Sequence, residues 1–176
     1  TEVVLAALRE WGVAALHRFN GMFALALWDC TEERLLLARD RMGIKPLYLH
    51  ASDEGLIWAS EIRALLASNR VHRKLNQAGV IDFLRYQTVH GPDTLIEGVE
   101  LLPAGHLLWA DDNETKTESW WDPAAAGAKA ANDGQPWTYN LAPATTKVQE
   151  LLIDSVQLRM RSDVPFGAFL SGGIDS

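Results

Sequence analysis

The stretch G-M-F-A-L-A-L-W, residues 21–28, is apolar throughout. A run of this length and composition predicts a strand that is buried on both faces. Residues 29–33 supply a polar turn, and 34–38 supply the returning strand. Two more short apolar runs, 47–49 and 56–58, flank another polar turn. Strands that follow one another so closely are joined by short turns, so the sequence predicts an antiparallel sheet.

Helical patterns lie on either side of these strands in the chain. Residues 2–11 and 13–19 predict two short helices before the first strand. Ser60 is expected to cap a helix over 61–68. Asn76 is expected to cap the next helix, whose apolar face consists of Val80, Ile81 and Leu84. Helices combined with sequentially adjacent strands predict an α+β fold.

A change in composition divides the chain. Residues 99–109 predict two further strands joined by a Pro-Ala-Gly turn, and 115–121 predict an edge strand. The following segment, 122–143, is rich in Ala, Gly, Asn and Pro, which is typical of an interdomain linker. The predicted organisation is therefore a first domain over 1–121, this linker, and the start of a second domain over 144–176.

The C-terminal segment, V-P-F-G-A-F-L-S-G-G-I-D-S over 164–176, carries the clearest chemical signal. Its apolar run 166–170 predicts a buried strand that leads directly into a glycine loop. Consecutive glycines let a phosphate approach the backbone N–H groups, and serine hydroxyls add donors. No lysine follows the glycines, so this is not a Walker loop. The pattern instead indicates ATP cleavage between the α and β phosphates.

Each residue of this loop has an expected role. The groups that hold the pyrophosphate are expected to belong to Ser171, Gly172, Gly173 and Ser176. Asp175 is expected to place Mg²⁺. The alternative role for Asp175 is the N-cap of a following helix, and the two roles are compatible. An incidental turn is the alternative for the whole loop, but the order strand, Ser, Gly, Gly, Asp, Ser favours a nucleotide site.

The charged loop R-D-R-M-G-I-K, residues 39–45, has two interpretations. In the first, Arg39 and Arg41 bind an anion. In the second, these arginines and Asp40 form a structural ion-pair turn before the next strand, and we favour this interpretation. Cys30 follows an apolar strand and has no glycine-rich or basic surroundings, so it is expected to be buried and structural rather than nucleophilic.

Composition excludes several classes of function. The 176 residues carry a formal net charge of −7, without a basic stripe, which argues against a nucleic-acid partner. No apolar run approaches the roughly 18 residues that a membrane span needs, so no membrane partner is expected. The single cysteine excludes an intrachain disulfide and favours a cytoplasmic protein. The five histidines show no metal-ligand spacing. Without an initiator Met, the natural N-terminus is expected to lie upstream.

Five segments of this sequence resemble, in order and spacing, the glutamine-hydrolysing asparagine synthetases. They are R-F-N-G-M-F-A-L-A-L-W-D (18–29), A-R-D-R-M-G-I-K-P-L-Y (38–48), A-S-E-I-R-A-L-L (59–66), L-P-A-G-H (102–106) and S-D-V-P-F-G-A-F-L-S-G-G-I-D-S (162–176). The resemblance implies a class II glutaminase domain, an αββα sandwich of the Ntn-hydrolase type. It also implies an α/β ATP-pyrophosphatase domain, similar to adenine nucleotide α-hydrolases. The chain would hold the C-terminal part of the first and the first helix, strand and loop of the second.

The resemblance also implies an activity. Aspartate, glutamine and ATP would give asparagine, glutamate, AMP and pyrophosphate through β-aspartyl-AMP, so the enzyme would be a carbon–nitrogen ligase. ATP and Mg²⁺ would be the cofactors, the partners would be these small molecules, and a homodimer is compatible with the architecture. Phe169 and Leu170 correspond to the family's nucleotide-contacting segment, although the family more often has Leu at the position of Phe169.

The glutaminase half of this activity has no counterpart among these residues. The family uses an N-terminal cysteine nucleophile, an arginine, an Asn-Gly pair and an aspartate, and it places that aspartate immediately before the position of Thr1. The chain is therefore expected to be an internal fragment without activity of its own. One alternative is an amidotransferase of the same architecture that acts on another carboxylate in cell-surface or secondary metabolism. A naturally truncated, non-catalytic module is the other.

Overall fold

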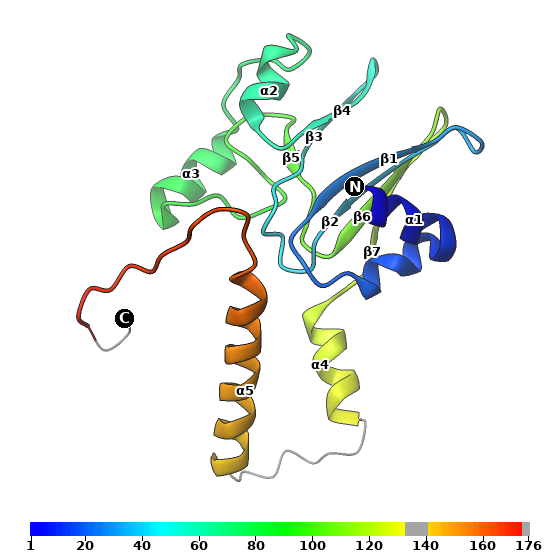
Figure 1. Ribbon diagram of the computed structural model, residues 1–176. Coiled ribbons are helices and arrows are strands. Elements are labelled where there is room, and N and C mark those ends of the chain that lie inside the picture. Colours follow the sequence, from blue (N-terminus) through cyan, green and yellow to red (C-terminus); the bar gives the residue numbers. More distant parts are fainter. Residues whose placement is uncertain (133–140, 174–176) are drawn as a thin grey trace. The chain divides into compact units, whose positions relative to one another are not determined.

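The computed structural model describes residues 1–132 and 141–173, which fall into two compact units, Thr1–Ala128 and Lys129–Ser176 (Figure 1). The first unit contains, in chain order, α1 (Glu2–Trp11), the 3₁₀ helix η1 (Gly12–Arg18), β1 (Ala24–Asp29), β2 (Arg34–Arg39), β3 (Tyr48–Ser52), β4 (Gly55–Ala59), α2 (Ile62–Ala67), α3 (Gln77–Tyr86), β5 (Glu100–Leu101), β6 (His106–Ala110) and β7 (Thr115–Ser119). Helix α4 (Pro123–Asn132) crosses the boundary, and α5 (Leu141–Arg159) belongs to the second unit. None of the helices in the described ranges is both long and apolar enough to cross a membrane.

The first sheet has the order β1-β2-β6-β7 and is antiparallel throughout. Its register aligns Leu36 with Leu27 on one side and Leu37 with Leu108 on the other. The expectation that β1 is buried on both faces is wrong, because Trp28 is 54% exposed. β2 is the strand with both faces covered. Among the described residues, β2 has a neighbouring strand on each side, whereas β1 pairs with β2 alone.

The second sheet has the order β4-β3-β5 and is also antiparallel. The predicted strands within 99–109 exist, but they do not pair with each other. β5 pairs with β3, and β6 pairs with β2, so the Pro-Ala-Gly turn carries the chain from one sheet to the other. Gly105 in this turn has φ +66°, and a Cβ there would lie 2.3 Å from the carbonyl oxygen of Trp121. Glycine is therefore required for the crossing.

Three apolar clusters show that the first unit has four layers. One cluster joins α1 and η1 to the first sheet and includes Leu16 and Leu36. Another, around Leu37 and Leu49, lies between the two sheets. In the third, Leu65 of α2 packs against the outer face of the second sheet. The order is therefore helix, sheet, sheet, helix (Figure 1), and the expected α+β fold with antiparallel strands is confirmed.

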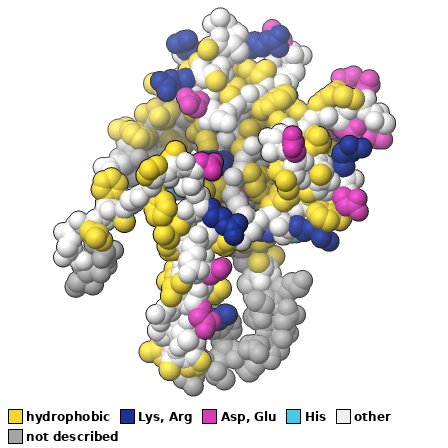
Figure 2. All heavy atoms as spheres, in the orientation of Figure 1, with side chains coloured by type: hydrophobic (Ala, Val, Ile, Leu, Met, Phe, Trp, Pro, Cys, Tyr) yellow, Lys and Arg dark blue, Asp and Glu magenta, His cyan; other side chains and the backbone are white. Residues whose placement is uncertain are grey.

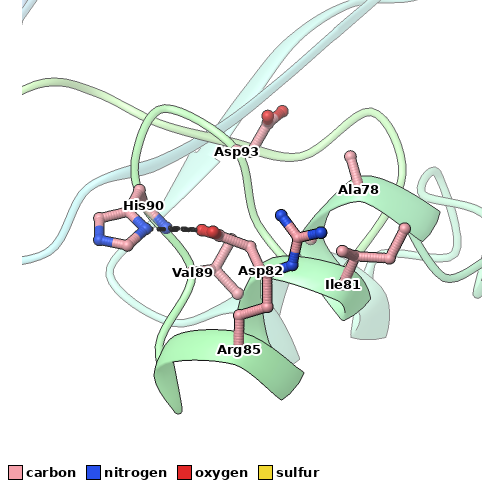
Figure 3. A pocket seen from close by; sticks show the side chains of 8 residues that line it. Ala78, Ile81, Asp82, Arg85, Val89, His90 and Asp93 are labelled. Atoms are coloured by element: carbon pink, nitrogen blue, oxygen red, sulfur yellow. Dashed lines mark hydrogen bonds and ion pairs between the residues drawn. The ribbon is translucent and has the colours of Figure 1, made fainter.

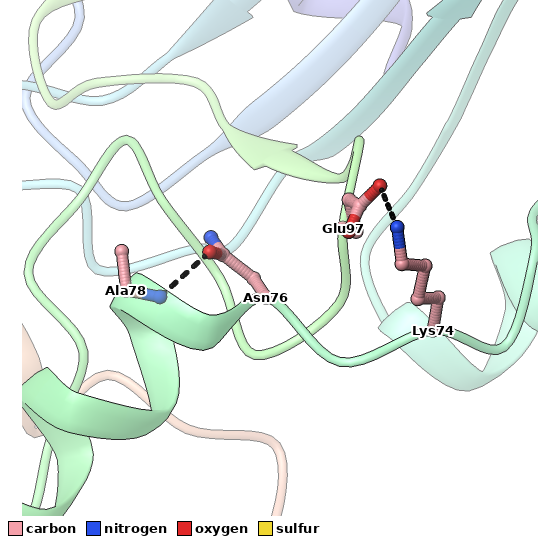
Figure 4. Close-up of polar contacts among 4 residues, drawn as sticks. All are labelled: Lys74, Asn76, Ala78 and Glu97. Atoms are coloured by element: carbon pink, nitrogen blue, oxygen red, sulfur yellow. Dashed lines mark hydrogen bonds and ion pairs between the residues drawn. The ribbon is translucent and has the colours of Figure 1, made fainter.

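The two helices that follow β4 in the chain, α2 and α3, differ from expectation in detail. Helix α2 is preceded by Glu61 rather than Ser60, and no side chain caps it. Asn76 caps α3 as predicted, because its side chain accepts the N–H of Ala78 at 3.1 Å (Figure 4). The predicted apolar face of α3 is exposed instead: Ile81 and Leu84 are 52% and 76% accessible. The reason is that α3 packs through Gly79 and the backbone of residue 94.

The second unit is less regular than the sequence predicts. Part of the predicted linker forms α4, in keeping with the helix propensity of its alanines; residues 133–140 of that linker lie outside the described residues. Helix α5 forms, and its apolar side chains remain at the surface (Figure 2). The strand predicted over 166–170 is absent. A strand needs a hydrogen-bonded neighbour, and within the described residues none pairs with this segment. The domain boundaries stay a prediction.

Candidate functional site

The glycine loop at the C-terminal end is described as far as Gly173. Gly172 has φ +76°, a left-handed conformation that favours glycine. The N–H of Gly173 points to the hydroxyl oxygen of Ser171 at 3.5 Å. The loop thus bends tightly and brings a hydroxyl beside a backbone N–H, which are the two donor types that a phosphate uses. Phe169 and Leu170 before it are exposed.

The described part of the chain contains some, but not all, of the predicted site residues. Asp175 and Ser176 lie outside the described residues, so their expected roles stay predictions. Within the described ranges, no group of three or more His, Cys, Asp or Glu side chains is arranged to hold a metal ion.

The charged loop after β2 is built around the carboxylate of Asp40, which is 1% exposed. Four backbone N–H groups donate to it, at 3.0 to 3.2 Å: those of Phe23, Met42, Ile44 and Lys45. Burial raises the pKa of Asp40, but the hydrogen bonds from these four donors together lower it by more. The pKa of Asp40 therefore lies below the ordinary aspartate value. The carboxylate therefore stays ionised and fixes the path of the loop.

Arg39 binds the same loop through backbone carbonyl groups, whereas Asp40 binds backbone N–H groups. Its guanidinium donates to the carbonyl oxygens of Lys45 at 2.8 Å, Leu102 at 2.6 Å and Gly43 at 2.5 Å. Burial lowers the pKa of Arg39, and the negative charge of Asp40 opposes this shift. Gly43 has φ +62°, and a Cβ there would lie 2.9 Å from Arg39 Cζ. Glycine thus leaves room for the guanidinium.

Arg41 completes the network on the other side of the loop. It donates to the carbonyl oxygens of Phe19 at 2.5 Å and His17 at 2.7 Å, and its guanidinium lies 5.4 Å from the Trp120 ring centroid. The structural interpretation of this loop is confirmed, since backbone groups occupy both arginines. The ion-pair part was wrong: in this described segment no salt bridge joins Arg39 to Asp40, whose carboxylate binds backbone N–H groups.

A pocket of about 410 Å³ lies between α3 and the loop that follows it (Figure 3). Its apolar wall includes Ile81 and Val89. Asp82 Oδ2 accepts hydrogen bonds from the backbone N–H of His90 at 2.7 Å and from its ring Nδ1 at 2.8 Å. Both hydrogen bonds lower the pKa of Asp82, and the one from the His90 backbone has the larger effect.

This acid–histidine pair was not foreseen from the sequence, where His90 carried no signal. The pair depends on the loop folding back over α3, which no local pattern encodes. The lining residues include no serine, threonine or cysteine that the pair could activate. The two hydrogen bonds anchor the loop to the helix. The expectation that Cys30 is buried was wrong, since it is exposed in the turn between β1 and β2.

Comparison with protein families gives two matches in this chain. Residues 1–121 match the model of the glutamine amidotransferase domain, and residues 147–176 match that of asparagine synthase. The chain therefore belongs to the glutamine amidotransferase domain family.

Three curated relatives carry more specific names than the family does. Asparagine synthetase (glutamine-hydrolysing) 2 of Bacillus subtilis is 34% identical over 99% of this chain and 24% of its own length. An asparagine synthetase-type protein of Mycobacterium tuberculosis is 36% identical over 99% of this chain and 27% of its own. Amidase chry2 of Gibberella zeae is 34% identical over 99% and 25%. The chain thus spans about a quarter of the length of these relatives.

Among solved structures, glutamine phosphoribosylpyrophosphate amidotransferase from B. subtilis, complexed with ADP and GMP, is 18% identical and gives a TM-score of 0.44. The superposition covers 65% of this chain and 19% of that one. A score at this level assigns no fold.

Proposed function

We propose that this chain is part of a glutamine-hydrolysing asparagine synthetase. One observation carries the proposal: a glutamine amidotransferase match is followed, in the same chain, by an asparagine synthase match that ends on the glycine loop. The first unit would belong to an Ntn-type glutaminase that releases ammonia. The second would open an ATP-pyrophosphatase domain that activates aspartate as β-aspartyl-AMP. The proposed division is 1–121, a linker over 122–143, and 144–176.

The glycine loop would hold the departing pyrophosphate. The Ser171 hydroxyl and the N–H groups of Gly172 and Gly173 would donate to phosphate oxygens, and such charge-assisted bonds are stronger than neutral ones. The left-handed conformation of Gly172 supports this role, because it bends the backbone without placing a Cβ in the path of an anion. Phe169 and Leu170 would contact the nucleotide, and their exposure leaves them free to do so.

Mg²⁺ would be held by Asp175, with Ser176 close to the same phosphates. The donor chemistry fits, because Mg²⁺ in nucleotide sites commonly takes one or two carboxylates together with phosphate oxygens and water. The ion would neutralise charge that develops on the pyrophosphate. The single cysteine of the sequence supports a cytoplasmic setting.

A second candidate is an amidotransferase of the same architecture that acts on a different carboxylate. The similarity to amidase chry2 favours it, because this relative carries a different name at a similar level of identity. Comparing aspartate with other carboxylic acids as acceptors, using the protein from the complete reading frame, distinguishes the two candidates. Asparagine as the sole amide product excludes the second.

The role of the loop is tested in that same protein with Ser171→Ala and Gly172→Val. Aspartate-dependent exchange of pyrophosphate into ATP should fall by about a hundredfold, because each change removes or displaces a donor at the phosphates. Glutamine hydrolysis without ATP should stay unchanged. Ser52→Ala, at the exposed end of β3, is the control. If both loop variants keep wild-type exchange, the loop does not bind the pyrophosphate.

A further inference from the structure

The pocket between α3 and the loop that follows it is held in shape by contacts at both ends of that loop. At the start of the loop, His90 binds Asp82 through its backbone N–H and its ring, and the ring packs edge-on against Tyr86 with the centroids 5.0 Å apart. Further along, the carbonyl of Pro92 accepts the N–H of Leu101 at 2.8 Å. The pocket is therefore preformed, and a preformed pocket avoids the entropy cost of ordering a loop on binding.

Direct backbone contact joins the end of this loop to the helix. A Cβ at Gly79 of α3 would lie 2.4 Å from the carbonyl oxygen of Thr94, so the glycine allows the two segments to touch. Thr94 is itself buried, and its hydroxyl donates to the carbonyl of Val99 at 2.8 Å. The helix and the loop thus form two fixed walls of the same pocket.

Two opposite charges line this pocket from different elements. Arg85 belongs to α3, and Asp93 belongs to the loop. Figure 3 shows the guanidinium and the carboxylate apart from each other, and among the described residues no ion pair joins them. Asp82, one turn before Arg85 on the helix, is engaged by His90 instead. The pocket therefore offers a cation and an anion as separate binding groups.

The remaining lining is apolar and comes from Ala78, Ile81 and Val89. The volume of about 410 Å³ suits a small molecule. A carboxylate fits Arg85, because the planar guanidinium binds such a group through two parallel hydrogen bonds. An ammonium group fits Asp93, and an aliphatic side chain fits the wall of Ile81 and Val89. An α-amino acid with an aliphatic side chain carries all three of these groups.

We propose that this pocket binds a free α-amino acid with an aliphatic side chain, with its carboxylate on Arg85 and its ammonium group on Asp93. The loop contacts made by Asp82 and His90 hold the two binding groups in place on either side of the ligand. This role is additional to the proposed synthetase activity and does not rest on it, because the pocket lies in the first unit and the glycine loop in the second.

Isothermal titration calorimetry with L-leucine tests the ligand class, using the protein from the complete reading frame without ATP. A small ligand with two charge-assisted contacts should bind with a dissociation constant of about 1 mM or lower. Isocaproate lacks the ammonium group of leucine, and isoamylamine lacks its carboxylate. Each should therefore bind at least about tenfold more weakly than leucine. If either analogue binds as tightly as leucine, the pocket does not recognise an amino acid and the proposal fails.

Two conservative variants locate the site. Arg85→Gln and Asp93→Asn each remove one charge at nearly constant size, so each should weaken leucine binding by about tenfold or more while the circular dichroism spectrum matches wild type. The matched controls are Arg63→Gln and Asp53→Asn, at exposed positions outside the pocket, and both should bind leucine as wild type does. Wild-type protein that does not bind leucine in the millimolar range overturns the proposal. Leucine binding that survives both pocket variants also overturns it, because the ligand then occupies another site.

Discussion

At the scale of single residues, the loop after β2 shows how a buried charge organises backbone. Asp40 accepts four backbone N–H groups, and Arg39 binds three backbone carbonyls of the same region. A buried charge is tolerated only when it is paired and hydrogen-bonded. Here the compensation comes mainly from peptide groups, so the pair fixes the chain path from Phe23 to Leu102 rather than forming a direct salt bridge.

Asp40→Ala should therefore destabilise the protein by at least about 2 kcal/mol, because it leaves several buried backbone N–H groups without their acceptor. Asp53→Asn, in the exposed turn between β3 and β4, should change stability by less than about 0.5 kcal/mol. Urea denaturation followed by circular dichroism measures both variants. Equal stability of the two would show that Asp40 does not organise the loop.

The same carboxylate predicts a pH dependence. Since folding lowers the pKa of Asp40, its contribution is complete above the unfolded-state value of about 3.9 and is lost as pH falls through the lower folded value. The free energy of unfolding of the wild type should thus decline below about pH 4, and Asp40→Asn should show a shallower decline.

At the scale of elements, the sequence predicted most helices and strands but not their neighbours. The apolar run 21–28 predicts a strand correctly, yet an edge strand and a central strand with the same composition look alike. The strands β5 and β6 were predicted as consecutive strands joined by a turn, but the sequence did not predict that this turn, with Gly105, leads from one sheet to the other. Ile81 and Leu84 have helical spacing, but Gly79 provides the contact that decides which face of α3 is buried.

Gly105→Ala tests the crossing between the sheets. A Cβ at φ +66° and 2.3 Å from the Trp121 carbonyl requires the backbone to move, so we expect a loss of at least about 2 kcal/mol in stability. Gly21→Ala is the control, because a Cβ there meets no atom within 4 Å. Thermal unfolding compares them. A Gly105→Ala protein as stable as its control would mean that the crossing does not need glycine.

At the scale of the whole molecule, the two units differ in how many apolar side chains they bury. The first unit contains all three apolar clusters, whereas α5 buries no residue. The glycine loop is predicted from sequence because its donors are contiguous, and its phosphate-binding role stays a prediction. The contact between Asp82 and His90 could not, because it depends on a loop that returns over α3. The strand before the glycine loop was predicted from composition alone, and composition does not supply its neighbours.

The most direct test of the proposed synthetase is an oxygen-transfer measurement on the protein from the complete reading frame. When ammonia displaces AMP from β-aspartyl-AMP, the bridging carboxylate oxygen leaves with the phosphate. Aspartate labelled with ¹⁸O in its β-carboxylate, incubated with glutamine, ATP and Mg²⁺, should give asparagine together with AMP that carries one ¹⁸O atom. Unlabelled AMP, or ADP and phosphate as the nucleotide products, would contradict the account.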